Sequence, residues 1–167
     1  MSLADDIARI KIQEECLRFT KFDEADAWAL GGAMRAAALA AKLPLAIGIQ
    51  VAGRVLFHAA LPGSSFDNAE WVRRKANLAM RFHKSSYRVS RELALSGQVF
   101  NETRGLQPID YAPAGGCFPI HLLGTGVVGT VGVSGIPQRE DHGFVVAQLC
   151  AFLGVSLADV ALGPESA

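Results

Sequence analysis

The chain has 167 residues, of which 50% are hydrophobic and 19% charged, and its 16 basic residues balance 16 acidic ones. This length suits one domain with a substantial core, and the composition excludes an intrinsically disordered chain. No apolar run approaches the ~20 residues that a membrane span requires, and the N-terminal "MSLADDIARIKIQEE" is charged rather than signal-like. We therefore expect a single domain over residues 1–167 that is soluble, cytoplasmic and not bound to a membrane.

The first half of the chain predicts two helices and a β-hairpin. Residues 1–20 are a candidate peripheral N-terminal helix. Asp23 is a good N-cap and Asp26 completes a capping box, so we expect an alanine-rich helix from Asp23 to Lys42, thin enough to lie close against a sheet. The segment "LAIGIQV" alternates large and small residues with the period of a strand, Gly53 supplies a turn, and "VLFHAA" returns as its hairpin partner.

The next predicted helix is amphipathic. Residues Ser65 to Asn68 can cap it, and an apolar stripe runs from Trp71 to Phe82 while arginines take the other face. A short helix from Tyr87 to Leu95 should follow, ended by Gly97. The segment "GLQPIDYAPAGG" then predicts a loop marked by proline and glycine.

A cluster of seven cations without any acid lies between Trp71 and Arg91. Such a local excess of positive charge could hold an anion. The alternative is a solvated helical face neutralised by Glu70, Glu92 and the acidic N-terminal third of the chain. The sequence leaves both interpretations open.

The segment "GTGVVGTVGVSG" contains the spacing G-x-G-x-x-G of a dinucleotide-binding turn. That turn works only where the third glycine opens a helix. Here Gly129 is followed by alternating glycine and β-branched residues, which favour a strand, and the preceding "CFPIHLL" is extended too. We therefore predict an antiparallel hairpin with its turn at Gly124 to Gly126, and no nucleotide loop.

The last predicted helix begins near Pro137 or Gln138 and is apolar almost all round from Val145 to Leu157. A helix without a polar face must be covered on both sides, and the simplest second cover is another subunit. We therefore expect a homo-oligomer, either a dimer or a ring of dimers.

The sequence lacks the motifs of several common catalytic and metal-binding sites. The segment "GVSGI" lacks the last glycine of a hydrolase elbow around Ser134. Four histidines and the separated Cys16, Cys117 and Cys150 show no metal-ligand spacing, so no metal site is predicted and the thiols are expected to be reduced and buried. Two histidines stay open as general acids or bases, His83 beside the basic segment and His142 beside two carboxylates.

Three stretches in order, "LPGSSFDNAEWVRRKANLAMRFHKSSYRV", "DYAPAGGCFPI" and "GVVGTVGVSGIPQREDH", resemble a family described as haem-degrading-domain proteins, a branch of the HbpS-like and GlcG-like superfamily. The resemblance implies an α/β (α+β) fold with one antiparallel sheet of about five strands, helices on both faces and a profilin-like outline. It also implies assembly into dimers or higher rings. The shared glycine-rich core is Gly115, Gly116, Pro119, Gly129, Gly132, Val133, Ser134, Gly135 and Asp141. The chain departs from the wider pattern by an extra residue between Gly116 and Pro119 and by His142 in place of an acid.

The leading functional hypothesis is an oligomer that binds a small anionic ligand. One wall of its pocket would come from the glycine-rich segments, and cationic or polar residues would approach from the basic segment. Haem fits that description, with His83 or His142 as a possible iron ligand. The candidate ligand-binding residues are Arg74, His83, Lys84, Tyr87, Gly115, Gly116, Phe118, Pro119, Ser134, Gly135, Asp141 and His142.

Two alternatives stay open beside ligand binding. One is an enzyme acting on a small anionic or carbonyl substrate, with His83 or His142 as the general acid or base. The other is a scaffold that presents its basic face to protein partners. Nucleic acid is not expected as a partner, because the total charge is balanced and the aromatic residues do not interleave with the cations.

Overall fold

The computed structural model describes residues 1–165 and divides them between helices and one sheet. The helices are α1 (Leu3–Cys16), α2 (Glu24–Ala40), α3 (Phe66–Phe82), α4 (Ser86–Ser96), α5 (Gln138–Leu153) and α6 (Leu157–Val160), with a 3-10 turn η1 (Glu102–Arg104). The strands are β1 (Ala46–Val51), β2 (Arg54–Ala60), β3 (Cys117–Leu122) and β4 (Gly126–Ser134).

The strands of the described chain form one antiparallel sheet in the order β2-β1-β4-β3. This confirms the predicted α/β class and single antiparallel sheet, although the sheet has four strands where the resemblance implied about five. Both predicted hairpins are present, with β1 paired to β2 and β3 paired to β4. The central pair β1 and β4 comes from distant parts of the chain, with Ile49 opposite Val131.

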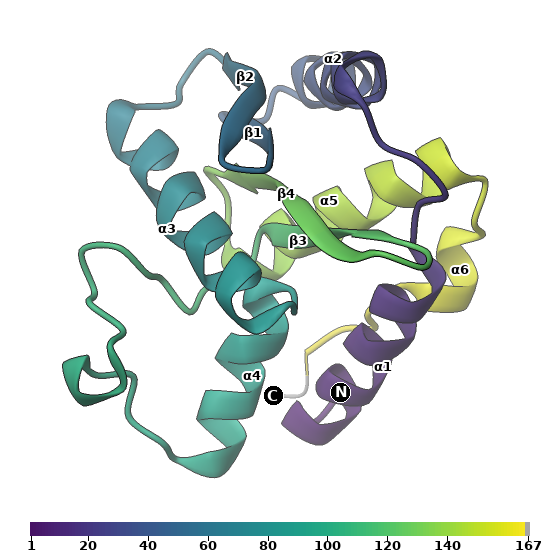
Figure 1. The fold of residues 1–167 in the computed structure, drawn as a ribbon. Coiled ribbons are helices and arrows are strands. Elements are labelled where there is room, and N and C mark those ends of the chain that lie inside the picture. Colours follow the sequence, from purple (N-terminus) through teal and green to yellow (C-terminus); the bar gives the residue numbers. More distant parts are fainter. Residues whose placement is uncertain (166–167) are drawn as a thin grey trace.

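Helices cover both faces of the sheet, as Figure 1 shows. Helix α3 lies over one face, where its Ala76 and Ala79 pack against Cys117 of β3. Helices α2 and α5 lie over the other face and enclose the main core with the inward side chains of the strands. Helix α1 packs beside α4 and α6, so the two ends of the described chain lie close together.

The glycine-rich segment is a strand, as predicted. Gly124 has a φ of 78°, which suits the turn between β3 and β4. A Cβ atom on Gly129 would lie 2.1 Å from the carbonyl oxygen of Gln50 on the neighbouring strand. The missing side chain at Gly129 therefore admits a neighbouring backbone rather than a ligand.

The sequence located the helix caps well. Asp23 and Asp26 form the capping box of α2, and Ser65 and Asn68 form that of α3. Gly97 ends α4 in the left-handed conformation. These features depend on a few neighbouring residues, which is why they can be predicted locally.

The last predicted helix is shorter than expected, and its apolar side chains pack against elements of its own chain. Gly154, with a φ of 71°, ends α5 at Leu153, so the segment to Leu157 is two elements rather than one. Helix α5 packs against the sheet, α2, α4 and α6 of its own chain, and Leu149 is completely buried there. The apolar character of this helix therefore does not require a second subunit, and assembly stays a prediction on other grounds.

Across the described residues, no helix combines the length and apolar character that crossing a bilayer requires.

Candidate functional site

A hollow of about 350 Å³ opens where α3, the loop before β3, the end of β4 and the start of α5 meet. We call it the α3–α5 hollow. It brings together four of the predicted ligand-binding residues, Gly115, Ser134, Gly135 and Asp141. The remaining lining residues are Asp67, Asn68, Trp71, Lys75, Ala114, Ile136 and Gln138.

The floor of the hollow is a buried ion pair between α3 and α5. Lys75 Nζ lies 3.1 Å from Asp141 Oδ2 and also donates to the carbonyl oxygens of Gly115, at 2.8 Å, and Val133, at 2.7 Å. Lys75 is 1% exposed and Asp141 3%. Because the ammonium has three hydrogens and three acceptors, it has no donor left for a ligand.

Burial opposes the charged form of both partners. It lowers the pKa of Lys75, although the Asp141 carboxylate acts in the opposite direction. It raises the pKa of Asp141, although Lys75 and the backbone N–H groups of Ile136 and Gly135 act in the opposite direction. The pair therefore depends on its mutual attraction and its hydrogen bonds to stay charged.

Glycines allow the two loops to approach this pair. A Cβ on Gly116, whose φ is 122°, would lie 2.5 Å from Lys75 Nζ. A Cβ on Gly115 would lie 2.1 Å from the carbonyl oxygen of Gln138, and one on Gly135 would lie 2.2 Å from that of Pro44. Side chains at Gly115 and Gly116 would push the loop away from α5 and Lys75, and one at Gly135 would push the end of β4 away from the segment before β1.

The hollow has hydrogen-bond donors that the described chain leaves open. Ser134 is 6% exposed, and within residues 1–165 its hydroxyl group has no hydrogen-bond partner. Gln138, the first residue of α5, lines the hollow. Pro137 caps this helix without a side-chain hydrogen bond, so the backbone N–H groups of Gln138 and of the adjacent Arg139 and Glu140 have no acceptor among residues 1–165. The start of a sixteen-residue helix also carries a partial positive charge.

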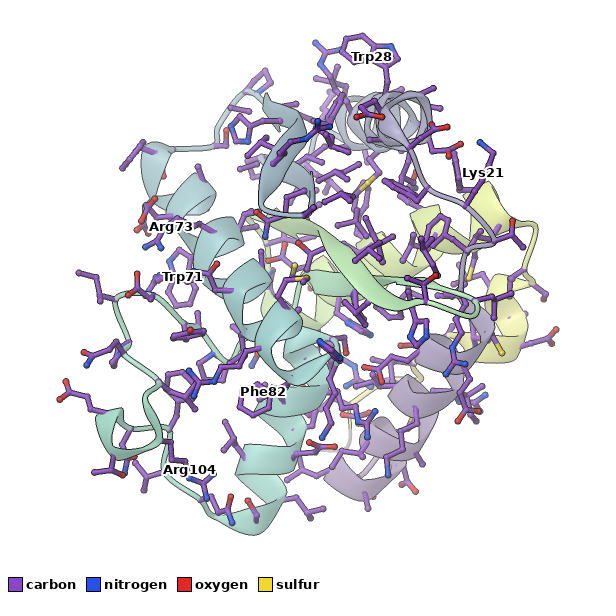
Figure 2. All side chains as sticks on the ribbon, in the orientation of Figure 1. Lys21, Trp28, Trp71, Arg73, Phe82 and Arg104 are labelled. Atoms are coloured by element: carbon purple, nitrogen blue, oxygen red, sulfur yellow. The ribbon has the colours of Figure 1, made fainter. Side chains whose placement is uncertain are left out.

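The opposite wall is aromatic and acidic. Trp71 Nε1 donates to Asp67 Oδ2 at 3.1 Å, and the guanidinium carbon of Arg74 lies 4.2 Å from the centre of the indole ring. Figure 2 shows Trp71 on α3 and the second tryptophan, Trp28, projecting outward from α2. The hollow thus offers an apolar wall and the Asp67 carboxylate opposite the donors of α5 and Ser134.

The other candidates from the basic segment do not line this hollow. Arg74 donates to the carbonyl oxygen of Pro108, and Lys84 pairs with Glu92 at 2.8 Å. Tyr87 is completely buried, and its hydroxyl group accepts a hydrogen bond from Arg139 at 3.2 Å. His83 is exposed and lies with His121 in a separate polar depression of about 380 Å³.

Most cations of the basic segment form ion pairs with acidic side chains of the same chain. This agrees with the alternative interpretation of the sequence, in which nearby acids neutralise the basic face. Arg73 pairs with Glu70 and Asp110, and Arg88 pairs with Glu14 and Glu92. Arg91 pairs with Glu165. Glu14 belongs to the acidic N-terminal third, and it also accepts the backbone N–H of Ser85.

His142 and Phe118 lie in the interior. His142 is 1% exposed, and burial lowers its pKa to about 3. Because the Gln13 amide donates to the carbonyl oxygen of Val160, its oxygen faces His142 Nε2 at 2.8 Å, which places the imidazole hydrogen on Nε2. Phe118 faces the main core, while Pro119 borders the depression at His83.

Neither of the two histidines predicted as iron ligands lies in a site that fits haem. His142 Nε2 is occupied by Gln13 and has no open space before it, and the depression beside His83 is lined mainly by charged side chains. Gly132 offers no flat face to a ring, because a Cβ there would lie 2.9 Å from Cys117 Sγ. Within residues 1–165, no three metal-ligating side chains come together either.

Lys75 and Trp71 are lining residues that the sequence analysis did not single out as ligand-binding. A signal existed for Lys75, because it lies three residues after Val72 and four before Ala79, both on the buried stripe of α3. A charged residue at such a position has to be paired inside. Its partner, 66 residues further along the chain, is visible only in the fold.

Comparison with known proteins supports the resemblance found in the sequence. Residues 22–150 match the model of the HbpS-like family, described as haem degrading protein HbpS-like. A UPF0303 protein of Acidobacterium capsulatum is 49% identical over 158 residues, which cover 95% of this chain and 96% of the relative. A UPF0303 protein of Mesorhizobium japonicum is 46% identical over 166 residues, with 99% of each chain covered.

Solved structures share the fold. Ybr137w matches with a TM-score of 0.79 and 28% identity over 89% of this chain and 87% of its own. HbpS matches with a TM-score of 0.64 and 20% identity, covering 82% of this chain and 93% of its own. PduOC, solved as a haem complex, matches with a TM-score of 0.67 and 19% identity, covering 81% of this chain and 96% of its own.

Proposed function

The chain belongs to the HbpS-like family, and from that premise we propose that it is a small-ligand-binding protein whose site is the α3–α5 hollow. The ligand we propose is a small carboxylate that also carries a hydrogen-bond donor. The observation that carries this proposal is the group of open donors formed by Ser134 and Gln138, which line the hollow, together with the adjacent backbone N–H groups at the start of α5.

A carboxylate suits those donors. Backbone N–H groups at a helix N-terminus, together with a hydroxyl group, bind anionic oxygens and need no side-chain cation. Lys75 cannot supply the charge, since Asp141 and two carbonyl oxygens occupy it. The anion is therefore bound by neutral dipoles beside a neutralised pair.

The wall formed by α3 determines which second polar group the ligand has to carry. Asp67 would repel a ligand of purely negative character, but it can accept a hydrogen bond from a hydroxyl or ammonium group. Trp71 offers an indole surface to the carbon skeleton between the two polar ends. A small hydroxy acid or amino acid has this distribution of groups.

The test uses mandelate, which has a carboxylate, a hydroxyl group and an aromatic ring. In a Trp28→Phe background, Trp71 is the remaining tryptophan, so its fluorescence reports occupancy of the hollow. We expect saturable quenching by mandelate and much weaker quenching by the neutral mandelamide. Ser134→Ala should weaken mandelate binding by about tenfold, because it removes one hydrogen bond to a charged group.

The matched control is Ser156→Ala, an exposed serine at the start of α6 without a side-chain cap bond. It should bind mandelate as the parent does. Equal affinity for mandelate and mandelamide, or equal loss in the two serine variants, would contradict the proposal.

We also propose that the protein is a homo-oligomer. Support comes from exposed apolar side chains around the edge strand β2: Val55 is 68% exposed, Trp28 72% and Phe66 81%. Large exposed apolar residues in one region often mark contacts between subunits. Native mass spectrometry should show a multimer that Val55→Lys and Phe66→Lys together dissociate; a monomer for the parent chain would contradict this.

A further inference from the structure

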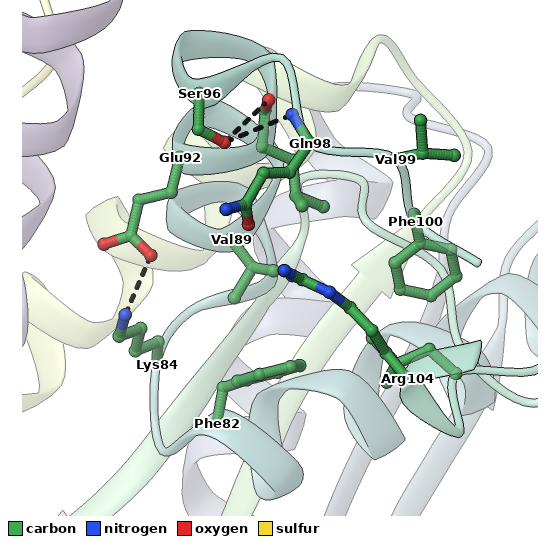
Figure 3. A pocket seen from close by; sticks show the side chains of 11 residues that line it. Phe82, Lys84, Val89, Glu92, Ser96, Gln98, Val99, Phe100 and Arg104 are labelled. Atoms are coloured by element: carbon green, nitrogen blue, oxygen red, sulfur yellow. Dashed lines mark hydrogen bonds and ion pairs between the residues drawn. The ribbon is translucent and has the colours of Figure 1, made fainter. Parts of the chain in front are cut away.

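A second pocket, separate from the hollow, lies between the end of α3, helix α4 and the loop that follows it. We call it the α4 pocket; its volume is about 310 Å³, near the lower end of the range typical for small-molecule sites. None of its lining residues lines the α3–α5 hollow. Figure 3 shows the pocket from close by.

The walls of the α4 pocket are mainly apolar. Val89 and Leu93 lie one turn apart on α4, and Leu106 from the loop packs with them in a small core cluster. Phe82, at the end of α3, remains 39% exposed, and Phe100 from the loop lies across the pocket. An alkyl chain placed here would remove these surfaces from water.

One charge in the pocket has no partner in the described part of the chain. Lys84 pairs with Glu92 at 2.8 Å, and Glu92 also accepts from Arg88 at 2.9 Å, so these groups satisfy one another. Within residues 1–165, the Arg104 guanidinium makes no hydrogen bond or ion pair. Figure 3 shows the Arg104 side chain extending across the pocket toward Val89.

The fold fixes the backbone at Arg104. The turn η1 places this residue, and Gly105 ends the turn with a φ of 66°. Arg81 of α3 then donates to the carbonyl oxygens of Arg104, at 2.9 Å, and Gly105, at 2.8 Å. One arginine therefore anchors the loop while the other stays available to a ligand.

We propose that the α4 pocket binds a medium-chain monoanion, with its alkyl chain between Phe82, Val89, Leu93 and Phe100 and its carboxylate on Arg104. The apolar walls require a hydrocarbon chain, and the unpaired guanidinium requires one anionic head. An arginine fork suits a carboxylate because it donates two parallel hydrogen bonds.

Calorimetric titration of the full-length protein with octanoate and hexanoate tests the chain requirement. Each buried CH₂ group tightens binding by about fourfold, so octanoate, with two more such groups, should bind roughly fifteenfold more tightly than hexanoate, at one molecule per chain. Equal affinities for the two acids, or no binding of octanoate, would overturn the proposal.

Substitutions at Arg104 test the head-group requirement. Arg104→Gln should weaken octanoate binding by about tenfold and remove the preference for octanoate over octanol. The matched control is Arg35→Gln, because Arg35 is exposed on α2 and is remote from both pockets in the chain. If Arg104→Gln binds like the parent, or if Arg35→Gln loses as much affinity, the assignment is wrong.

Two substitutions at an exposed residue of the pocket test octanoate binding without unfolding the chain. Val99 borders the pocket and is 69% exposed, so neither Val99→Asp nor Val99→Asn should unfold the chain. Val99→Asp should repel octanoate, whereas Val99→Asn should bind it nearly normally. Octanoate should leave Trp71 fluorescence and mandelate affinity unchanged; competition between the two acids would place octanoate in the α3–α5 hollow and refute the second site.

Discussion

Lys75 Nζ lies 3.1 Å from Asp141 Oδ2, and this buried contact ties the middle of α3 to the first turn of α5. The same ammonium reaches the carbonyl oxygens of Gly115 and Val133, so one side chain joins two helices, the loop before β3 and the end of β4. The shape of the α3–α5 hollow therefore depends on it.

Replacement of Lys75 by an uncharged residue should destabilise the fold. Lys75→Met leaves the Asp141 carboxylate buried without its cation, and we expect the free energy of unfolding to fall by about 3–5 kcal/mol. The double variant Lys75→Met, Asp141→Asn should lose less than the sum of the two single changes, because no uncompensated charge remains. Urea denaturation measures both effects. Lys21→Met, at an exposed lysine, is the control and should change little.

Two adjacent glycines of α2 should respond in opposite directions to alanine. A Cβ on Gly31 would lie 2.3 Å from the Phe57 ring of β2, so Gly31→Ala should destabilise the packing of α2 on the sheet. A Cβ on Gly32 would meet nothing within 4 Å, so Gly32→Ala should stabilise the helix by about 0.5–1 kcal/mol. Thermal unfolding compares the pair. A Gly31→Ala variant as stable as Gly32→Ala would show that α2 does not lie so close to β2.

The contrast between local and distant features explains what could be predicted from the sequence. Capping boxes such as Asp23 with Asp26 and the turn at Gly124 depend on a few neighbouring residues, and the structure confirms them. Period-2 alternation likewise indicated both hairpins. The sequence does not show which distant segments meet, so Lys75 is one cation among seven there, and its contact with Asp141 is visible only in the fold.

The candidate site was foreseen in part for the same reason. The glycine-rich segments pointed to Gly115, Ser134 and Gly135, which lie together in the hollow. Proximity in sequence groups the cations of the basic segment, but a helix distributes neighbouring residues around its axis, and His83 and Lys84 lie beyond the end of α3. Arg74, His83 and Lys84 consequently lie in different surroundings.

Stability should fall with acidification through His142. Burial holds the pKa of His142 at about 3 in the folded chain, whereas the unfolded imidazole has its ordinary pKa of 6.5. Between these values the unfolded state binds a proton that the folded state does not, so stability is lost as the pH falls, by roughly 1.4 kcal/mol per pH unit well below 6.5.

Urea midpoints between pH 7.5 and pH 5 measure this loss. The variant His142→Gln should have a flatter pH dependence than the parent chain, whereas His58→Gln, at an exposed histidine of β2, should keep the parent slope. Identical slopes for the parent chain and His142→Gln would exclude His142 as the titrating group.

The thiols should differ sharply in reactivity. Burial raises the pKa of Cys117 to about 12, so its nucleophilic thiolate is scarce at neutral pH, and Cys150 is buried as well. Cys16 is exposed at the end of α1, so the expectation that all three thiols are buried is wrong for this residue. Iodoacetamide at pH 8 should therefore modify Cys16 alone in the native protein and all three cysteines in urea, as counted by mass spectrometry. Rapid native labelling of Cys117 would contradict the packing of α3 on β3.

The central claim is that a small carboxylate binds to the start of α5, and amide chemical shifts test it most directly. In a ¹H–¹⁵N titration with mandelate, we predict that the backbone amides of Gln138, Arg139 and Glu140 shift strongly and saturate together, while that of Gly32 stays unchanged. The same titration of Ser134→Ala should need about tenfold more mandelate. Shifts at the α5 amides no larger than that at Gly32 would contradict the account.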